Sequence, residues 1–157
     1  MLTLVLHSLE ETAALGRRMA ALLRTGPLRV LLLRGDLGAG KTTLTRALVQ
    51  ALPGGDDAEI SSPSFTICNC YPTRPPVAHC DLYRSAGSLP DDVLDALEDE
   101  GCLVIIEWAE LLPEADMPQE YLDISLQSCK NERHITLHAH GAAADLFLRG
   151  LQQGTMA

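Results

Sequence analysis

Residues 35–42 read GDLGAGKT, and this stretch decides the fold. It matches in full the pattern G-x-x-x-x-G-K-[ST] of loops that surround a nucleotide phosphate with backbone N–H groups. Residues 30–33 before it form an apolar block typical of a buried strand, and apolar side chains recur at helical spacing over residues 42–52. The stretch is therefore predicted to join a strand to a helix N-terminus, where free N–H groups and the helix dipole favour an anion.

The loop contains residue types that are suited to binding phosphate and Mg²⁺. Glycines at three positions let the backbone curl round a phosphate, Lys41 can reach the β- and γ-phosphates, and the Thr42 hydroxyl can ligate Mg²⁺. The alternative interpretation is a glycine-rich turn with a solvated lysine, which the flanking strand and helix disfavour.

Composition indicates a single domain over residues 1–157, with a tail frayed from about residue 151. The net charge of −9 predicts that the surface as a whole repels nucleic-acid backbones, and residues 85–129 contain no Lys or Arg. No apolar run reaches the length of a membrane span and no signal peptide is expected. The five cysteines are odd in number and are expected to be reduced thiols rather than a disulfide framework. Strand alternation is preferred to a metal site at Cys68, Cys70, His79 and Cys80.

The remaining elements follow from periodicity and turn residues. An N-cap at Ser8 predicts a helix that ends at residues 26–27, and residues 127–132 suit a hairpin link. Strands are expected at residues 2–6, 65–71, 77–81, 102–106, 121–126 and 133–139, and further helices at 90–100 and 141–150. The fold class is therefore α/β: a three-layer P-loop NTPase fold whose central sheet is mostly parallel and has antiparallel edge strands.

Two carboxylates follow predicted strands. Glu107 ends the most apolar run of the chain and is placed like a Walker-B acid, but Ile106 occupies the position where an Asp often precedes it. Asp81, at the end of the strand over 77–81, is the second candidate. Either residue could activate water, and either could instead be a solvated acid at a strand end.

The hydroxyl-rich residues 61–66 have two interpretations. They could close over a γ-phosphate, or they could form a turn whose hydroxyls cap backbone groups, which composition favours. Base identity is weakly encoded, but the absence of an N-K-x-D element favours ATP over GTP. Arg84 and Arg133 are candidate phosphate-charge stabilisers or ordinary surface arginines.

Four segments together resemble the TsaE (YjeE) family. They are GDLGAGKTT at 35–43, SPSFT at 62–66, HCDLYR at 79–84 and EW at 107–108, with the D-L-Y-R element followed by E-W as the specific part. Ser64 stands where the family usually has Thr, and the segment after Arg84 matches poorly.

The resemblance implies a cytoplasmic Mg²⁺-dependent ATPase, slow alone, that works with the TsaB and TsaD proteins in tRNA threonylcarbamoyladenosine modification. The tRNA would be held by those partners. In this family Thr42 and Glu107 would hold Mg²⁺, and Asp81 and Lys41 would support hydrolysis with Glu107. The resemblance implies nucleotide contacts at Leu9, Gly38, Ala39, Gly40, Lys41, Thr42, Thr43, Trp108 and Arg133. Two rival functions stay open: a nucleotide-binding regulatory module with little hydrolysis, and a P-loop kinase of a small metabolite.

Overall fold

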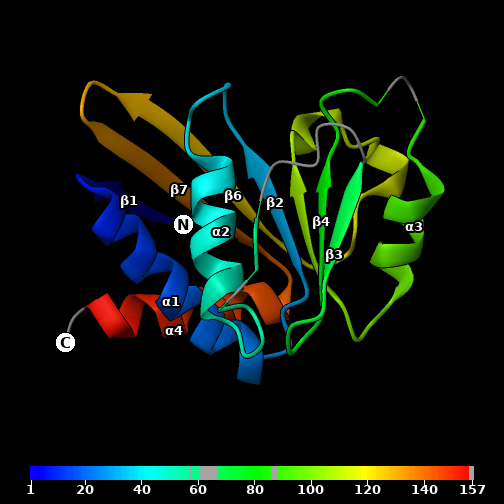
Figure 1. The fold of residues 1–157 in the computed structure, drawn as a ribbon, viewed down its shortest axis with the longest axis horizontal. Helices are drawn as coiled ribbons and strands as arrows, with labels where there is room; N and C mark the ends of the chain where they lie inside the picture. Colours follow the sequence, from blue (N-terminus) through cyan, green and yellow to red (C-terminus); the bar gives the residue numbers. More distant parts are fainter. Residues whose placement is uncertain (57, 61–66, 86–87, 156–157) are drawn as a thin grey trace.

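The computed structural model describes residues 1–56, 58–60, 67–85 and 88–155. The elements alternate between strands and helices along much of the chain (Figure 1). The strands are β1 (Leu2–Leu6), β2 (Val30–Arg34), β3 (Cys68–Tyr71), β4 (Val77–Asp81), β5 (Leu103–Glu107), β6 (Tyr121–Cys129) and β7 (Glu132–His140). The helices are α1 (Leu9–Thr25), α2 (Lys41–Ala51), α3 (Asp91–Glu98) and α4 (Ala142–Thr155), with short 3-10 helices η1 (Ala109–Leu111) and η2 (Glu114–Asp116).

These strands form one seven-stranded mixed sheet in the order β1-β7-β6-β2-β5-β4-β3. The four central strands, β6, β2, β5 and β4, run parallel to one another. The outer strands are antiparallel additions: β3 pairs with β4 on one side, and β7 and β1 extend the other. The predicted α/β fold with a parallel centre and antiparallel edges is confirmed. Because β2 is central, the glycine-rich loop that follows its carboxyl end starts in the middle of the sheet.

Alternation along β2 divides the core between the two faces of the sheet. Leu31 and Leu33 belong to a large cluster that includes buried side chains of α1, α2 and α4. Val30 and Leu32 point the other way, into a smaller cluster closed by α3 and η1. Both faces of β2 are therefore covered by other elements. A strand buried on both faces needs apolar side chains on both, and this explains the continuous hydrophobic run in its sequence.

Helix α1 begins where the sequence predicts. The Ser8 side chain accepts a hydrogen bond from the Glu11 N–H, which satisfies one free donor of the first turn. Gly16 in the middle of α1 faces α2 so closely that an added Cβ would lie 2.6 Å from the Ala47 Cβ. The absence of a side chain at Gly16 therefore permits close packing of the two helices.

The predicted fraying from about residue 151 is wrong for residues 151–155. Helix α4 continues through Thr155, and Leu151 is fully buried. Leu151 completes the apolar stripe of Ala144, Phe147 and Leu148, and its carbonyl accepts a hydrogen bond from Arg18 of α1. Burial of this stripe stabilises the last turns beyond the predicted end at residue 150. The β6–β7 ladder is also longer than predicted and extends to the Cys129–Glu132 pair.

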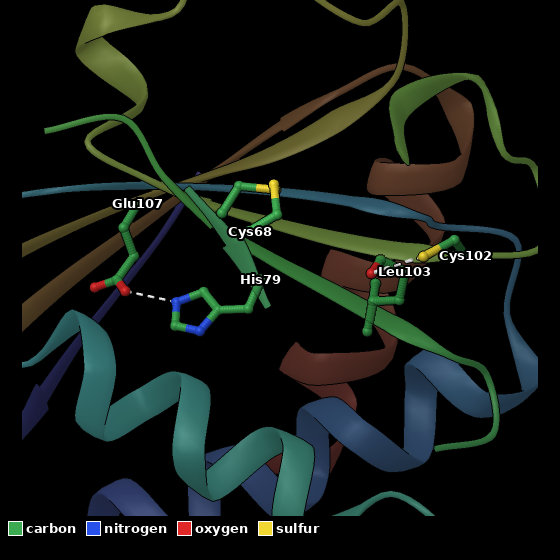
Figure 2. Close-up of a disulfide and its surroundings, with 6 residues drawn as sticks. Cys68, His79, Cys102, Leu103 and Glu107 are labelled. Carbon is green, nitrogen blue, oxygen red and sulfur yellow. Dashed lines mark hydrogen bonds and ion pairs between the residues drawn. A yellow bond between two sulfur atoms is a disulfide. The ribbon is translucent and has the colours of Figure 1, made fainter. Parts of the chain in front are cut away.

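The expectation of reduced cysteines is wrong for one pair. Cys68 on β3 and Cys80 on β4 form a disulfide, with their Cα atoms 4.1 Å apart (Figure 2). The antiparallel register places these two residues directly opposite each other, and register is a detail that a predicted hairpin leaves open. Cys70 and Cys129 are exposed free thiols, and Cys102 is buried.

Helices long and apolar enough to cross a membrane are absent from the ranges described above.

Candidate functional site

The glycine-rich loop leaves β2 at Gly35 and enters α2 at Lys41. Gly35, Gly38 and Gly40 have φ angles of +143°, +78° and +104°, a region that side chains rarely adopt. Gly40 is the N-cap residue of α2 and carries no side-chain cap, so no side chain occupies the N-terminal donors of that helix. The predicted strand–loop–helix arrangement is therefore confirmed in its geometry.

Lys41 is the first residue of α2, and its side chain is folded back over the loop. Its Nζ donates to the carbonyl oxygens of Gly35 and Asp36, and it lies 4.4 Å from the centroid of the Trp108 ring. The residue is only 5 % exposed. These contacts hold a positive charge at the mouth of the loop, within reach of an anion that the loop would bind.

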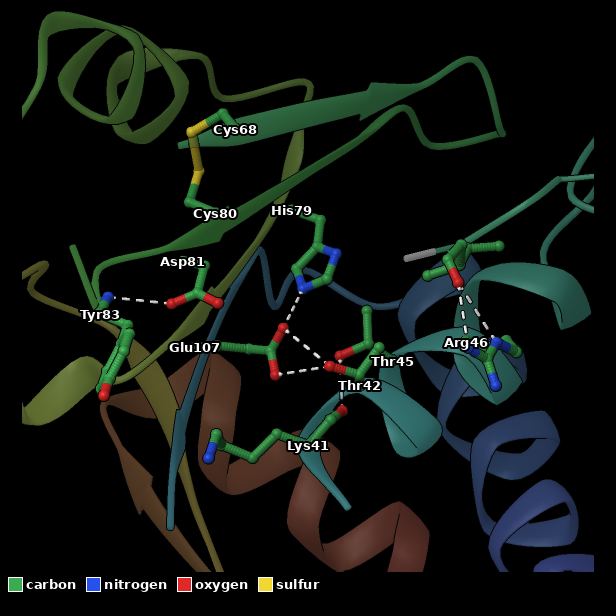
Figure 3. A network of polar contacts seen from close by, with 11 residues as sticks. Lys41, Thr42, Thr45, Arg46, Cys68, His79, Cys80, Asp81, Tyr83 and Glu107 are labelled. Atoms are coloured by element: carbon green, nitrogen blue, oxygen red, sulfur yellow. Dashed lines mark hydrogen bonds and ion pairs between the residues drawn. A yellow bond between two sulfur atoms is a disulfide. The ribbon is translucent and has the colours of Figure 1, made fainter. Parts of the chain in front are cut away.

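Thr42 and Glu107 meet at the head of α2 (Figure 3). The Thr42 hydroxyl donates to Glu107 Oε1 at 3.1 Å, with Oε2 at 3.4 Å. Glu107 ends β5 and is 2 % exposed. Its Oε2 also lies 2.6 Å from Nε2 of the fully buried His79 on β4. A buried carboxylate thus has polar partners from two other elements.

Asp81 lies beside this group. It pairs with Glu107 in the parallel β4–β5 register, and its backbone N–H donates to the Ile67 carbonyl at 2.8 Å. Its Oδ1 accepts a hydrogen bond of 2.9 Å from the Tyr83 N–H (Figure 3). Both predicted carboxylates therefore stand at neighbouring strand ends, as parallel pairing requires.

Trp108 follows Glu107 directly in a left-handed conformation with φ 57° and ψ 44°. This conformation breaks the strand and lets the indole turn toward Lys41. The Tyr83 ring packs against it with centroids 4.9 Å apart. The two rings form one aromatic wall next to the loop.

One cavity of about 760 Å³ collects most of the predicted site, a size typical of small-molecule sites. Its lining includes the predicted residues Gly38, Gly40, Lys41, Thr42, Thr43, Asp81, Glu107, Trp108 and Arg133, together with Leu37, Ile67, Tyr83 and Arg84. Arg84, considered a phosphate-charge stabiliser from the sequence, is thus placed at the cavity.

Two predicted contact residues are not part of this lining. Ala39 is itself a residue of the loop, but its side chain is only 3 % exposed and packs in the core. Leu9 is 66 % exposed at the start of α1 and does not line the cavity. The hydroxyl-rich segment at residues 61–66 lies outside the residues that the structure describes.

Arg133 reaches the loop from the beginning of β7, just after the β6–β7 turn. A Cβ added to Gly40 would lie 2.7 Å from Arg133 Nε, so glycine is required for this approach. The Nε atom is buried, and none of the described residues hydrogen-bonds to it. A buried unpaired donor at the wall of a cavity is costly and is suited to a ligand acceptor.

Glu110 in η1 adds a second carboxyl near Lys41. Desolvation by burial raises the pKa of Glu110, and the positive charges of Arg34 and Lys41 oppose that rise. The side chain is not among those that line the cavity. It therefore belongs to the surroundings of the loop rather than to the site.

Reasoning from sequence missed His79 as a site residue. The sequence places His79 in a possible metal site with Cys68, Cys70 and Cys80 and in the segment at residues 79–84, and neither indicates a contact with Glu107. The signal was its spacing, because His79 and Asp81 are two residues apart on one strand and so point to the same face. Tyr83 was also missed, although it follows Asp81 closely.

The donor set fits Mg²⁺. The Thr42 hydroxyl and the Glu107 carboxylate supply oxygen atoms only, and hard divalent cations prefer oxygen ligands. Both side chains line the same cavity as the loop glycines and Lys41. Asp81 contributes a further carboxylate to that lining.

The fold and the site define a class: α/β proteins in which a glycine-rich phosphate-loop sequence, a threonine hydroxyl and a strand-end carboxylate line one cavity. Comparison with known proteins gives the family. The profile described as "Threonylcarbamoyl adenosine biosynthesis protein TsaE" matches residues 6–135, and the chain belongs to this TsaE family.

Relatives and a solved structure agree. The chain is 36 % identical over 147 residues to the tRNA threonylcarbamoyladenosine biosynthesis protein TsaE of Streptomyces coelicolor, which covers 84 % of this chain and 95 % of that protein. It is also 36 % identical over 146 residues to the Bacillus subtilis protein of the same name, covering 92 % and 89 %. The crystal structure of Bacillus subtilis YdiB superposes with a TM-score of 0.78 at 34 % identity, over 98 % of this chain and 95 % of that one.

Proposed function

We propose that this protein is a Mg²⁺-dependent ATPase of the P-loop NTPase fold that serves tRNA threonylcarbamoyladenosine modification together with TsaB and TsaD. The observation that carries the proposal is the pairing of Thr42 with Glu107 directly at the phosphate loop. A glycine-rich loop alone would bind many anions. A hydroxyl and a buried carboxylate beside it favour a nucleotide that arrives with a divalent cation.

ATP binding would use the chain's own donors. The N–H groups of residues 38–43 would surround the phosphates at the N-terminus of α2, and Lys41 would move from the loop carbonyls to the β- and γ-phosphates. The Arg133 Nε–H, which has no partner among the described residues, is available to donate a hydrogen bond to a nucleotide oxygen. Trp108 and Tyr83 would bound the nucleotide on one side.

Hydrolysis would need a cation and a positioned water. Thr42 and Glu107 would hold Mg²⁺, which neutralises phosphate charge when it is bound. Asp81 lines the cavity next to Glu107, and we assign it to support hydrolysis by orienting the attacking water. Lys41 would stabilise charge on the transferred phosphoryl group.

The charge balance supports division of labour with partners. At a net charge of −9, with lysines only at Lys41 and Lys130, the chain lacks the clustered cations that nucleic-acid backbones require. We therefore propose that tRNA is held by TsaB and TsaD and that the ATPase works with them in the cytoplasm. The names of its relatives refer to this tRNA modification.

ATP hydrolysis with and without TsaB and TsaD tests the proposal. We expect slow release of phosphate by the protein alone and faster release in the presence of both partners. Phosphate transfer only on addition of a small-molecule acceptor would indicate a kinase. Tight ATP binding with no turnover under any of these conditions would indicate a regulatory module.

Binding of tRNA is tested separately. We expect no retardation of tRNA by the lone protein in a gel-shift titration at physiological salt. Tight, salt-sensitive binding by the lone chain would contradict the assignment of the tRNA to the partners.

A further inference from the structure

We propose that His79 is a positioning residue that holds the Glu107 carboxylate in the orientation needed for the divalent cation of the bound nucleotide. The inference rests on the proposed role of Glu107 and goes beyond it, because it assigns a task to a residue that would touch neither nucleotide nor cation. His79 is 0 % exposed and does not line the cavity.

The geometry fixes both oxygens of the carboxylate. His79 Nε2 lies 2.6 Å from Glu107 Oε2, and the Thr42 hydroxyl lies 3.1 Å from Oε1. The two partners come from different elements, β4 and α2, on two sides of the carboxylate (Figure 3). A carboxylate held at both oxygens cannot rotate about its terminal bond, so its outward lone pairs keep one direction.

The direction of the hydrogen bond follows from the same contacts. An ionised carboxylate only accepts hydrogen bonds, so Nε2 carries the proton and donates it to Oε2. The other ring nitrogen of His79, Nδ1, is buried and has no hydrogen-bond partner among the residues that the structure describes. A lone pair is less costly to bury there than an N–H donor would be, which favours the tautomer protonated at Nε2 alone.

The backbone places His79 for this contact. In the parallel ladder Asp81 pairs with Glu107 and His79 pairs with Ile105, two residues earlier on both strands. His79, Asp81 and Glu107 therefore share one face of the sheet, the face covered by α2. Outer partners of this kind orient ligand side chains at metal sites, and their loss typically reduces metal affinity about 10–100-fold.

If the His79–Glu107 contact only stabilised the fold, loss of His79 would have a different effect than if the contact positioned Glu107. Two buried polar groups that only satisfy each other would stabilise the fold equally with and without a cation. A positioning residue acts on the orientation of Glu107, so its loss would reduce the part of nucleotide affinity that depends on Mg²⁺. That part is measurable without any turnover.

Two amide variants provide a matched test. In His79→Gln the amide nitrogen lies near the position of Nε2 and can still donate to Glu107. In His79→Asn the amide ends near the position of Nδ1 and falls short. We would measure ADP affinity by calorimetry in Mg²⁺ and in EDTA for the wild type and both variants. We expect the Mg²⁺-dependent gain in affinity to fall about 10–100-fold in His79→Asn. His79→Gln should keep most of it, and affinity in EDTA should be the same for all three.

The outcomes are distinguishable. If wild-type ADP affinity does not depend on Mg²⁺, the proposed function fails and this inference fails with it. If the wild type shows the dependence and His79→Asn keeps it in full, only the positioning role is overturned. The positioning role would also be overturned if His79→Gln and His79→Asn both melted at the wild-type temperature and lost the Mg²⁺-dependent gain in ADP affinity equally. The distance from the amide to Glu107 would then have no effect.

A measurement on the wild-type protein covers the case in which a variant does not fold. Among the five histidines His79 is the fully buried one, so its ring signals are recognisable in ¹⁵N-histidine NMR by slow exchange. We expect the Nε2-protonated tautomer, with a proton signal that shifts when Mg²⁺ is added to the ADP-bound protein. An Nδ1-protonated ring, or a signal unmoved by Mg²⁺, would contradict the proposal.

Discussion

The Thr42 hydroxyl and the Glu107 carboxylate lie 3.1 Å apart although 65 residues separate them in the chain. Thr42 lies in the first turn of α2 and Glu107 ends β5, and the parallel pairing of β2 with β5 brings these two ends together. The contact leaves one hydroxyl and one carboxylate at the edge of the loop cavity. Because this hydrogen bond couples the two side chains, substitution of either Thr42 or Glu107 should alter the Mg²⁺ concentration that ATP binding requires.

Glu107→Gln should preserve the shape of this unit and remove its charge. We expect a higher Mg²⁺ requirement for ATP binding and a loss of hydrolysis on the order of 100-fold, since a neutral amide is a poor ligand for a hard cation. Hydrolysis measured across a Mg²⁺ titration tests this. Glu110→Gln is the matched control, because it removes a nearby carboxyl that contacts neither Thr42 nor His79. Normal turnover of Glu107→Gln at low Mg²⁺ would shift the metal role to Asp81.

Lys41→Met should abolish tight ATP binding, because the charge aimed at the phosphates is lost while the side-chain stem remains. The buried Nζ also bonds two loop carbonyls, so unfolding free energy should fall by about 1–3 kcal/mol. Nucleotide titration and thermal unfolding measure the two effects. Lys130→Met, in the β6–β7 turn, should change neither. Wild-type ATP affinity in Lys41→Met would refute the phosphate-loop assignment.

Gly40→Ala and Gly38→Ala separate steric conflict from backbone strain. A Cβ at Gly38 meets no atom within 4 Å, so only the left-handed backbone penalty of about 1 kcal/mol applies. A Cβ at Gly40 would lie 2.7 Å from Arg133 Nε and would displace that side chain. We expect ATP affinity to fall much more in Gly40→Ala. Equal losses in the two variants would show that the Arg133 contact is immaterial.

Trp108 is the single tryptophan of the chain, so its emission reports on the site without labelling. Its ring contacts Lys41 and Tyr83 at the cavity wall. Addition of ADP with Mg²⁺ should displace Lys41 from the ring and change the emission in a saturable manner. Emission that stays constant while calorimetry reports saturation would place the nucleotide away from the indole. Tyr83→Leu, which removes the neighbouring ring, should alter the starting spectrum but keep the response.

Counting thiols tests the disulfide. Unfolded without reductant, the protein should react with alkylating reagent at three cysteines, Cys70, Cys102 and Cys129, and with reductant at all five. In the folded protein Cys70 and Cys129 should react first. Burial raises the pKa of Cys102, so less of its reactive thiolate is present and its alkylation should be slower. Five reactive thiols in the absence of reductant would show that Cys68 and Cys80 are not linked.

Most of the fold could be predicted from local sequence patterns. The loop over 35–42, the apolar run before Glu107 and the cap at Ser8 each specify one element through nearby residues. The parallel centre is expected because parallel strands need crossover connections, and helices join several strands of this chain. Because β4 and β5 are parallel neighbours, their carboxyl ends lie at the same edge of the sheet, and Asp81 and Glu107 are adjacent there.

The missed features depend on register and on distant packing. The Cys68–Cys80 bond exists because the two strands align at those residues, and no local pattern fixes that alignment. The role of Leu151 depends on contacts with α1, and the contact of His79 with Glu107 depends on the offset between β4 and β5. The exposure of Leu9 also depends on packing, since it is set by how α1 lies on the sheet, and a nucleotide contact at Leu9 stays a prediction.

The central place of β2 has a consequence for the order of events in folding. Its neighbours are β5 and β6, with Val30 beside Val104 and Leu31 beside Leu122, and the carbonyl of Leu126 packs against Gly35. On a ribosome the glycine-rich loop emerges long before any of these partners. Closing such long loops is slow because entropy is lost before contacts form. We therefore expect the glycine-rich loop to be synthesised before β5 and β6 and to acquire its final shape only once both strands are in place.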